Sequence, residues 1–176
     1  YIAKNLLLSF NSKHKLTILS RKTNDIVLKK KNYLKFDLKK KIPNLSCDIL
    51  IHAAGITPHG NYSSEDYNNI NFLSLKNIFQ KIKIKKKIIF FSTTEVYRNQ
   101  YENIPLKENK KIDKKKISDY AVSKYNCENF LRTISKKKYP FKKIILRLPG
   151  IVGKNNHKNF ISELTKNIIL KKKLVY

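Results

Sequence analysis

Apolar and polar positions divide this chain into short hydrophobic runs and longer amphipathic stretches. The short runs, rich in Ile and Leu, predict β-strands at residues 15–20, 33–36, 48–52, 87–92 and 142–148. Stretches with apolar residues three or four positions apart predict helices at residues 2–10, 65–82, 120–137 and 159–172, with a polar loop at 98–117. Strands that alternate with helices are typical of a parallel α/β sheet. No internal repeat or linker divides the chain.

The charge of the chain has two interpretations. Its formal net charge is +27, from 39 Lys and Arg against 12 Asp and Glu, which suggests a nucleic-acid-binding protein. Only four of the cations are Arg, however, and recognition surfaces usually depend on Arg for bidentate contacts. Lysine is spread along the whole chain, and abundant Lys, Ile and Asn are typical of an AT-rich genome. A solvated cationic surface is therefore favoured, and nucleic-acid binding remains the alternative.

Cysteine and hydropathy predict a cytoplasmic, soluble protein. Cys47 and Cys127 are far apart in the sequence and lack metal-ligand spacing, which favours free thiols in a reducing compartment. No apolar run reaches the ~18–20 residues needed to span a membrane, and no signal peptide is visible. The chain of 176 residues contains no Met, so we expect a fragment or a processed product, long enough for one domain with a core.

The most informative residues are Thr93, Tyr120 and Lys124. Thr93 follows the predicted strand 87–92, and Tyr120 and Lys124 lie four positions apart near the start of a predicted helix that Ser118 or Asp119 can cap. Such a pair permits proton transfer, because a nearby cation lowers the tyrosine pKa from its usual value of about 10. Ligands bind beyond the carboxyl ends of parallel strands, so Thr93 lies at the functional edge.

The Tyr-x-x-x-Lys spacing alone is weak evidence. It occurs twice, and about two matches are expected by chance in a chain with this many Tyr and Lys residues. The second match, Tyr139 to Lys143, contains Pro140 and runs directly into the strand 142–148. Its two side chains should not share a helix face. Tyr120 is therefore the predicted proton carrier.

The chain resembles the NAD(P)-dependent epimerase/dehydratase family of the extended short-chain dehydrogenase/reductase superfamily. Five segments match in order: Tyr-Ile-Ala at 1–3, Ile-His-Ala-Ala-Gly at 51–55, Phe-Ser-Thr-Thr-Glu-Val-Tyr at 91–97, Tyr-Ala-Val-Ser-Lys at 120–124, and Leu-Arg-Leu-Pro-Gly-Ile-Val-Gly at 146–153. The resemblance implies a Rossmann-like doubly wound parallel sheet. It assigns residues 1–158 to the NAD(P)-binding domain and 159–176 to the start of a truncated substrate-binding region.

By this resemblance, Ala3 stands at the last small-residue position of the family's glycine-rich turn. The first strand and the first two glycines of the turn are then missing. In a full protein this turn places backbone N–H groups and a helix N-terminus at the pyrophosphate. We therefore expect the isolated chain to bind dinucleotide poorly and to be inactive.

The resemblance also implies other cofactor-binding residues. Arg21 and Lys22 follow the second family strand, where a basic residue accommodates the 2′-phosphate of NADP, so NADP is favoured over NAD. Both could instead belong to the background charge. Asp37 resembles the adenine-contacting acid of the family, although it could be a turn residue. The remaining implied cofactor-binding residues are Ala53, Ala54, Gly55, Lys124, Pro149 and Ile151.

Catalytic roles follow from the same motifs. The resemblance makes Tyr120 the general acid/base, Lys124 the residue that lowers its pKa and holds the nicotinamide ribose, and Thr93 the hydrogen-bond partner of the reacting oxygen. Glu95 resembles a glutamate that moves a proton in sugar-nucleotide dehydratases, or it is a structural glutamate. His52 is interpreted as a packed or hydrogen-bonded structural residue, and Asn71 as the family's supporting helix asparagine.

The predicted function is that of a nucleotide-sugar epimerase or dehydratase that uses NADP or NAD and no metal. Its substrate would be a nucleotide-sugar or another small carbonyl or alcohol compound, and the resemblance is compatible with a homodimer. The alternatives are an NADP-dependent ketone or aldehyde reductase of the same superfamily and a non-catalytic basic nucleic-acid-binding member. The intact Thr93, Tyr120 and Lys124 set argues against the last.

Overall fold

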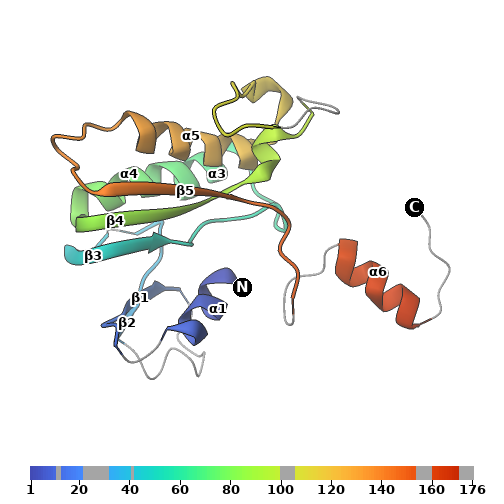
Figure 1. The fold of residues 1–176 in the computed structure, drawn as a ribbon, viewed down its shortest axis with the longest axis horizontal. Helices are drawn as coiled ribbons and strands as arrows, with labels where there is room; N and C mark the ends of the chain where they lie inside the picture. Colours follow the sequence, from blue (N-terminus) through green and yellow to red (C-terminus); the bar gives the residue numbers. More distant parts are fainter. Residues whose placement is uncertain (11–12, 22–31, 41, 100–105, 154–159, 171–176) are drawn as a thin grey trace.

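The computed structural model describes residues 1–10, 13–21, 32–40, 42–99, 106–153 and 160–170 (Figure 1). Its strands are β1 (Thr17–Ser20), β2 (Asn32–Lys35), β3 (Leu45–His52), β4 (Ile82–Thr93) and β5 (Lys142–Leu148). Its α-helices are α1 (Ile2–Ser9), α3 (Ser64–Tyr67), α4 (Ser74–Lys81), α5 (Asp119–Thr133) and α6 (Phe160–Ile169). A π-helix, η1 (Asn68–Leu73), joins α3 to α4, and two short 3₁₀ helices are η2 (Thr94–Tyr97) and η3 (Lys114–Lys116).

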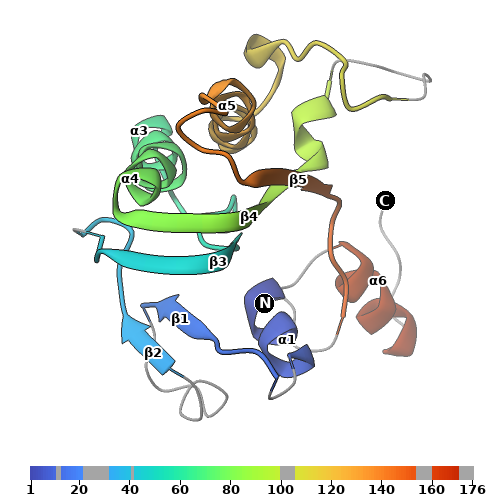
Figure 2. The same cartoon turned by 60° about the vertical axis from the view of Figure 1, so that its left-hand side comes forward.

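All strand pairs are parallel, as the alternation of strands and helices predicts. β1 pairs with β2, and β4 pairs with β3 on one side and β5 on the other. Figures 1 and 2 show α3, α4 and α5 on one face of the three-stranded sheet, with α1 beside β1 and β2. The fold is therefore the predicted Rossmann-like α/β architecture.

The two sheets match the 3-2 and 4-5-6 portions of a doubly wound strand order. In a doubly wound sheet of order 3-2-1-4-5-6, the first strand lies between the second and the fourth. Here the orders are β1-β2 and β3-β4-β5, so β1 and β3 correspond to the second and the fourth strand of that order. Among the described residues, no strand pairs with β3 on the side away from β4.

The core lies between the three-stranded sheet and its covering helices. Its fully buried side chains come from both layers: Leu75 of α4, Ile88 and Phe90 of β4, and Cys127 and Leu131 of α5. Aromatic rings extend this cluster toward the amino end of β5, where Phe79 packs on Phe130, Tyr139 and Phe141. This packing fixes α5 above the sheet, and α5 carries the predicted proton carrier.

The largest differences from the predicted element boundaries lie at the start of β4 and the end of α5. β4 begins at Ile82 instead of residue 87, because Ile82 and Ile84 are buried while Lys83 and Lys85 are exposed, which is the alternation of a strand. The lysines concealed this pattern in the sequence. α5 ends at Thr133 instead of residue 137, since the backbone at Ile134 leaves the helical region.

The predicted helix 65–82 is one helical stretch with a π-helical segment in its middle. A capping box at Ser63 and Asp66 starts it, with the backbone N–H of Asp66 donating to Ser63 Oγ at 3.1 Å. The π-helical segment contains Asn71, and such segments are frequent at functional sites. Within the residues the structure describes, no helix is both long and apolar enough to cross a membrane.

Candidate active site

Thr93 lies at the carboxyl end of β4, as predicted. Its Oγ1 accepts a hydrogen bond of 3.1 Å from the backbone N–H of Glu95, and the hydroxyl thereby caps η2. A threonine hydroxyl has one proton to donate as well as two acceptor lone pairs. Because the cap uses only an acceptor lone pair, the Thr93 proton stays free to donate to a reacting oxygen.

The helix of Tyr120 is capped and anchored by Ser118. Ser118 Oγ accepts from the backbone N–H of Ala121 at 3.2 Å, which confirms Ser118 as the N-cap. The same hydroxyl donates to Glu95 Oε1 at 2.9 Å. Glu95 therefore ties η2 to the start of α5, and it also lies 3.9 Å from Arg98 Nη1.

Lys124 makes the second link between α5 and β4. Its Nζ donates to the carbonyl oxygen of Phe91 at 2.9 Å and lies 5.0 Å from the centre of the Phe90 ring. Lys124 is only 8% exposed, and burial lowers the pKa of its ammonium group. An ammonium group has three N–H donors, so two remain for a ligand beyond the Phe91 contact.

These two links bracket the predicted catalytic residues. Phe91 of β4 and Glu95 of η2 lie two positions on either side of Thr93, while the N-cap Ser118 precedes Tyr120 and Lys124 follows it on α5. Tyr120 lies in between, half-buried, with its ring 6.0 Å from that of Tyr67 in an edge-to-face contact. The structure therefore brings β4, η2 and the first two turns of α5 together around Tyr120.

The expected effect of Lys124 on Tyr120 is not what the structure gives. Burial, followed by the negative charge of Glu95 and the neighbouring Tyr67, raises the pKa of Tyr120 to about 12. The predicted direction was downward, toward neutral pH. The reason is tertiary: burial disfavours the charged tyrosinate, the charge of Glu95 adds to this effect, and the Lys124 ammonium binds the Phe91 carbonyl. Tyr120 thus holds its proton at neutral pH.

Asn71 supports this region, as the family resemblance implies. Its Oδ1 accepts from the backbone N–H of Ile56 at 2.8 Å, and its Nδ2 donates to Ile56 O and to Ser123 Oγ. Ser123 in turn donates to the carbonyl oxygen of Tyr120 at 2.7 Å. Gly55 has a φ of +150°, and a Cβ there would lie 2.7 Å from Asn71 Oδ1, so glycine is required.

His52 is a packed residue at the end of β3, in agreement with its structural interpretation. It is 4% exposed, with its ring edge-to-face against Phe90. Within the described part of the chain, its Nε2 has no hydrogen-bond partner. Burial, and then the charge of Lys124, lowers the pKa of His52 to about 3. The histidine therefore stays neutral in the folded chain.

We expect the buried neutral His52 to make stability depend on pH. Between pH 6.5 and about 3 the unfolded chain binds a proton that the folded chain does not, so the free energy of unfolding falls with decreasing pH. Between pH 7 and 5 this amounts to about 2 kcal/mol, at ~1.4 kcal/mol per pKa unit. Urea unfolding of wild type and His52→Asn at both pH values measures it. The exposed His59→Asn is the control; an unchanged pH dependence in His52→Asn would contradict the assignment.

Five of the predicted cofactor-binding residues lie after β3 or at α1 and its neighbouring hollow. Ala53, Ala54 and Gly55 follow β3 at its carboxyl end, where their small side chains let a ligand approach the backbone. Ala3 lies in the first turn of α1, whose N-terminus has no side-chain cap. Ile151 and α1 line an open hollow of about 360 Å³.

The other predicted cofactor-binding residues lie near the ends of their strands. Arg21 is exposed directly after β1, and Lys22 lies outside the described residues. Asp37 Oδ1 accepts from the backbone N–H of Lys39 at 3.0 Å, the geometry of a turn residue. Pro149 is exposed after β5. The described residues contain no cluster of three or more His, Cys, Asp or Glu side chains that could hold a metal ion.

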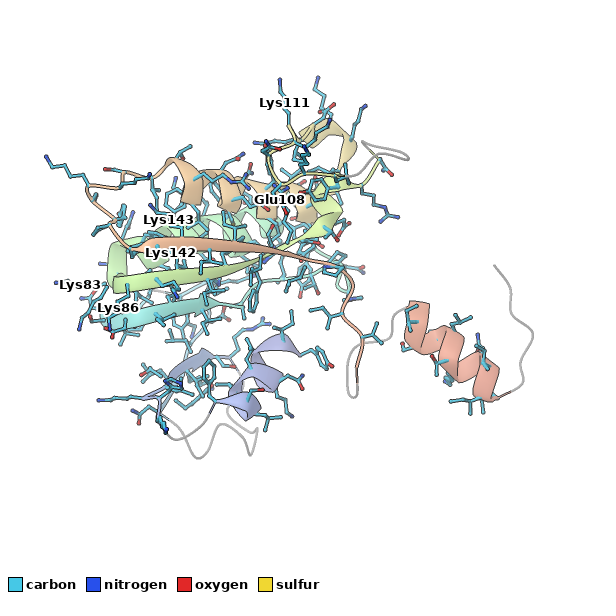
Figure 3. All side chains as sticks on the ribbon, in the orientation of Figure 1. Lys83, Lys86, Glu108, Lys111, Lys142 and Lys143 are labelled. Carbon is cyan, nitrogen blue, oxygen red and sulfur yellow. The ribbon has the colours of Figure 1, made fainter. Side chains whose placement is uncertain are left out.

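The structure keeps Tyr139 and Lys143 out of the site. Tyr139 packs on Phe79 and Phe141 beyond the end of α5. Lys143 Nζ donates to the backbone oxygen of Tyr139 at 3.4 Å and lies 5.8 Å from the centre of the Phe141 ring. The lysines labelled in Figure 3 on β4 and β5, Lys83, Lys86, Lys142 and Lys143, lie at the amino ends of these strands. They are therefore at the opposite end of the sheet from Thr93.

Two contributors to the site were not found in the sequence. Tyr67 has no predicted role in the sequence, yet its ring contacts Tyr120. Glu128 has no predicted role either, but it is fully buried and pairs with Arg147. The available signal was spacing, since Glu128 lies four positions after Lys124 and eight after Tyr120, on the same side of the helix.

Several solved structures share this fold, and their complexes contain NAD, NADPH or UDP. The Bordetella bronchiseptica enzyme WbmG in complex with NAD and UDP has a TM-score of 0.75 and 15% identity, over 99% of this chain and 58% of that one. UDP-glucuronic acid 4-epimerase from Bacillus cereus in complex with NAD has a TM-score of 0.71 and 19% identity, over 97% and 60%. RMD from Pseudomonas aeruginosa, complexed with NADPH, has a TM-score of 0.63 and 21% identity, over 77% and 51%.

The chain thus spans between about half and three fifths of the length of these proteins. No curated protein matches it significantly. At these identities the solved structures establish the fold alone. The model of the NAD dependent epimerase/dehydratase family, however, matches residues 1–176, the whole of the chain. The chain therefore belongs to the NAD-dependent epimerase/dehydratase family.

Proposed function

We propose that the whole protein is a nucleotide-sugar epimerase or dehydratase that works by transient oxidation of its substrate with NADP or NAD. The bracketing of Thr93 and Tyr120 carries this proposal. Two hydrogen bonds, from Lys124 to Phe91 O and from Ser118 to Glu95, hold the strand end and the helix start together. Family membership, the UDP-glucuronic acid 4-epimerase among the structural neighbours and the NAD and UDP bound by WbmG support it.

In this proposal Tyr120 moves the proton of the reacting hydroxyl or carbonyl group. Because its pKa is raised to about 12, Tyr120 is protonated at neutral pH and is ready to donate to a carbonyl oxygen that is being reduced. The oxidative half, which comes first in this proposal, needs a lower pKa at Tyr120 than the described residues alone provide. Thr93 donates its free proton to the same oxygen and limits its negative charge.

The residues present fit the nicotinamide end of a dinucleotide. Lys124 has two N–H donors left for the ribose, and its Nζ lies 3.8 Å from the position that a Cβ would take at Gly55. The uncapped start of α1, beside Ile151, offers backbone N–H groups to a phosphate. A bound nicotinamide dinucleotide supplies the hydride acceptor for such a reaction.

Three finer assignments belong to the same proposal. Arg21, exposed at the end of β1, favours NADP, while the structural neighbours include complexes with NAD and with NADPH. Glu95 is proposed as a second proton-transfer residue, although its bonds to Ser118 and Arg98 also give it a structural role. The two free thiols, Cys47 and Cys127, favour a cytoplasmic location.

The test uses the whole protein in which these residues occur. We expect the purified protein to carry a nicotinamide dinucleotide, detectable by absorbance and mass spectrometry after denaturation. It should convert one of the UDP-, GDP- or dTDP-sugars without added reductant. A reductase of the same superfamily would instead consume NADPH in proportion to a ketone or aldehyde. Absence of both bound dinucleotide and sugar conversion would reject the proposal.

A further inference from the structure

A buried ion pair connects the helix of Tyr120 to the neighbouring strand. Glu128 of α5 is 0% exposed, and the side chain of Arg147 on β5 is 7% exposed. Arg147 Nη2 lies 2.6 Å from Glu128 Oε2, and Arg147 Nε lies 2.9 Å from Glu128 Oε1. This is the bidentate geometry in which a planar guanidinium fixes both distance and orientation.

The contacts of this pair reach every segment that carries a proposed catalytic residue. Ser92, directly before Thr93, donates to Glu128 Oε1 at 2.5 Å. Arg147 also donates to the hydroxyl of Tyr97, in the same η2 turn as Glu95, and its guanidinium lies 4.7 Å from the Tyr97 ring centre.

On α5, Glu128 follows Lys124 by one helical turn and Tyr120 by two. Arg147 Nη1 donates further to the carbonyl oxygen of Glu108 at 3.2 Å, in the segment that Figure 3 shows above β5. One ion pair therefore joins α5, β4, β5, η2 and the segment around Glu108.

Stability alone is a weak reason for such an arrangement. Taking two charges out of water costs several kcal/mol per ion, and well-packed apolar side chains often stabilise equally well. Apolar contacts, however, tolerate small sliding of a helix along a sheet. A bidentate ion pair with further hydrogen bonds resists such sliding, because its donors and acceptors match in only one register.

We propose that Glu128 and Arg147 are positioning residues. They fix where α5 lies along the sheet, and thereby where Tyr120 and Lys124 lie relative to Thr93 on β4. The catalytic part of this inference rests on the proposed function, whereas its structural part rests on the contacts described above. Neither residue touches the reacting atoms; they act through α5 and Ser92.

Arg132 provides a matched comparison within the same network. Its Nη2 lies 3.0 Å from Glu128 Oε2, so it binds the same carboxylate as Arg147. It lies on the same helix as Glu128, one turn later, and its side chain is 43% exposed. Loss of Arg132 removes charge from the pair without releasing α5 from β4 or β5.

The test compares Arg147→Lys with Arg132→Lys in the whole protein. Tyrosines carry a ¹³C label at Cζ, and the Tyr120 resonance is assigned by its disappearance in Tyr120→Phe. We expect Arg147→Lys to shift the Tyr120 resonance and Arg132→Lys to leave it unchanged, with Tyr139 as an unaffected reference. Turnover of the sugar substrate should fall about 10-fold or more in Arg147→Lys with little change in KM, since a misplacement of ~1 Å costs on the order of 10²-fold.

The outcomes separate this inference from the proposed function. An unmoved Tyr120 resonance in folded Arg147→Lys overturns the positioning role, whatever the turnover. A shifted resonance in a protein that converts no sugar supports the positioning role and rejects the proposed function. If Arg147→Lys does not fold, Glu128→Gln, which keeps an acceptor for Ser92, takes its place with the same expected shift and the same overturning result.

Discussion

Replacing Tyr120 by Phe is expected to lower turnover by about 10²- to 10⁴-fold, the range in which a positioned acid or base contributes to catalysis. The substitution removes one hydroxyl and keeps the ring that packs edge-to-face on Tyr67. Folding and cofactor binding should therefore change little. Steady-state kinetics of the whole protein on its sugar substrate measure the loss, which should lie in kcat with KM nearly unchanged.

Two tyrosines serve as matched controls for this substitution. Tyr139→Phe tests the other Tyr-x-x-x-Lys pair, and its ring lies in the aromatic cluster of Phe79 and Phe141, away from the site. Tyr67→Phe keeps the ring contact with Tyr120 and removes only a neighbouring hydroxyl. Both variants should retain turnover within about threefold, well short of the loss expected for an acid or base. Full activity of Tyr120→Phe, or a comparable loss in Tyr139→Phe, would contradict the assignment.

The sequence predicts those parts of the fold whose signals are local. The strand 142–148 is found at its observed bounds, because a run of Ile and Leu lies between Pro140 and Pro149. The start of α5 follows from its Ser118 cap. The early start of β4 is missed, because a lysine in the sequence does not indicate which face of a strand is covered by other elements. The π-helix around Asn71 is missed because a shift in backbone hydrogen bonding has no simple residue pattern.

The sequence likewise predicts some features of the candidate site and misses others. Placing Thr93, Tyr120 and Lys124 on a strand end and a capped helix follows from sequence alone. The direction of the Tyr120 pKa shift does not follow from sequence, because it depends on burial and on the charge of Glu95. Glu95 is held near the start of α5 by its hydrogen bond with Ser118, which lies 23 positions away in the sequence. The partner of Glu128 lies 19 positions away, on another element, so a helix pattern cannot reveal it. Electrostatic properties thus need tertiary structure even where the residues are recognised.

The buried carboxylate of Glu128 leads to the largest expected change in stability. Glu128→Ala should lower the free energy of unfolding by about 3–5 kcal/mol, because it leaves Arg147 buried without its partner charge. It also leaves the hydroxyl of Ser92 without its acceptor and opens a cavity beside Leu131. Urea unfolding at neutral pH, followed by far-ultraviolet circular dichroism, measures the difference from wild type.

The matched controls separate an unpaired charge from a lost side chain. Glu65→Ala removes an exposed glutamate whose carboxylate accepts a hydrogen bond from Asn69, so its effect should stay within about 0.5 kcal/mol. The double variant Glu128→Met with Arg147→Met removes both charges and keeps much of the volume. It should be less destabilised than Glu128→Ala, because replacing a buried pair by apolar residues is often neutral, whereas breaking it is not. If the double variant loses at least as much stability as Glu128→Ala, then the hydrogen bonds of Arg147 to Tyr97 and Glu108, rather than the unpaired charge, dominate the energetics of this network.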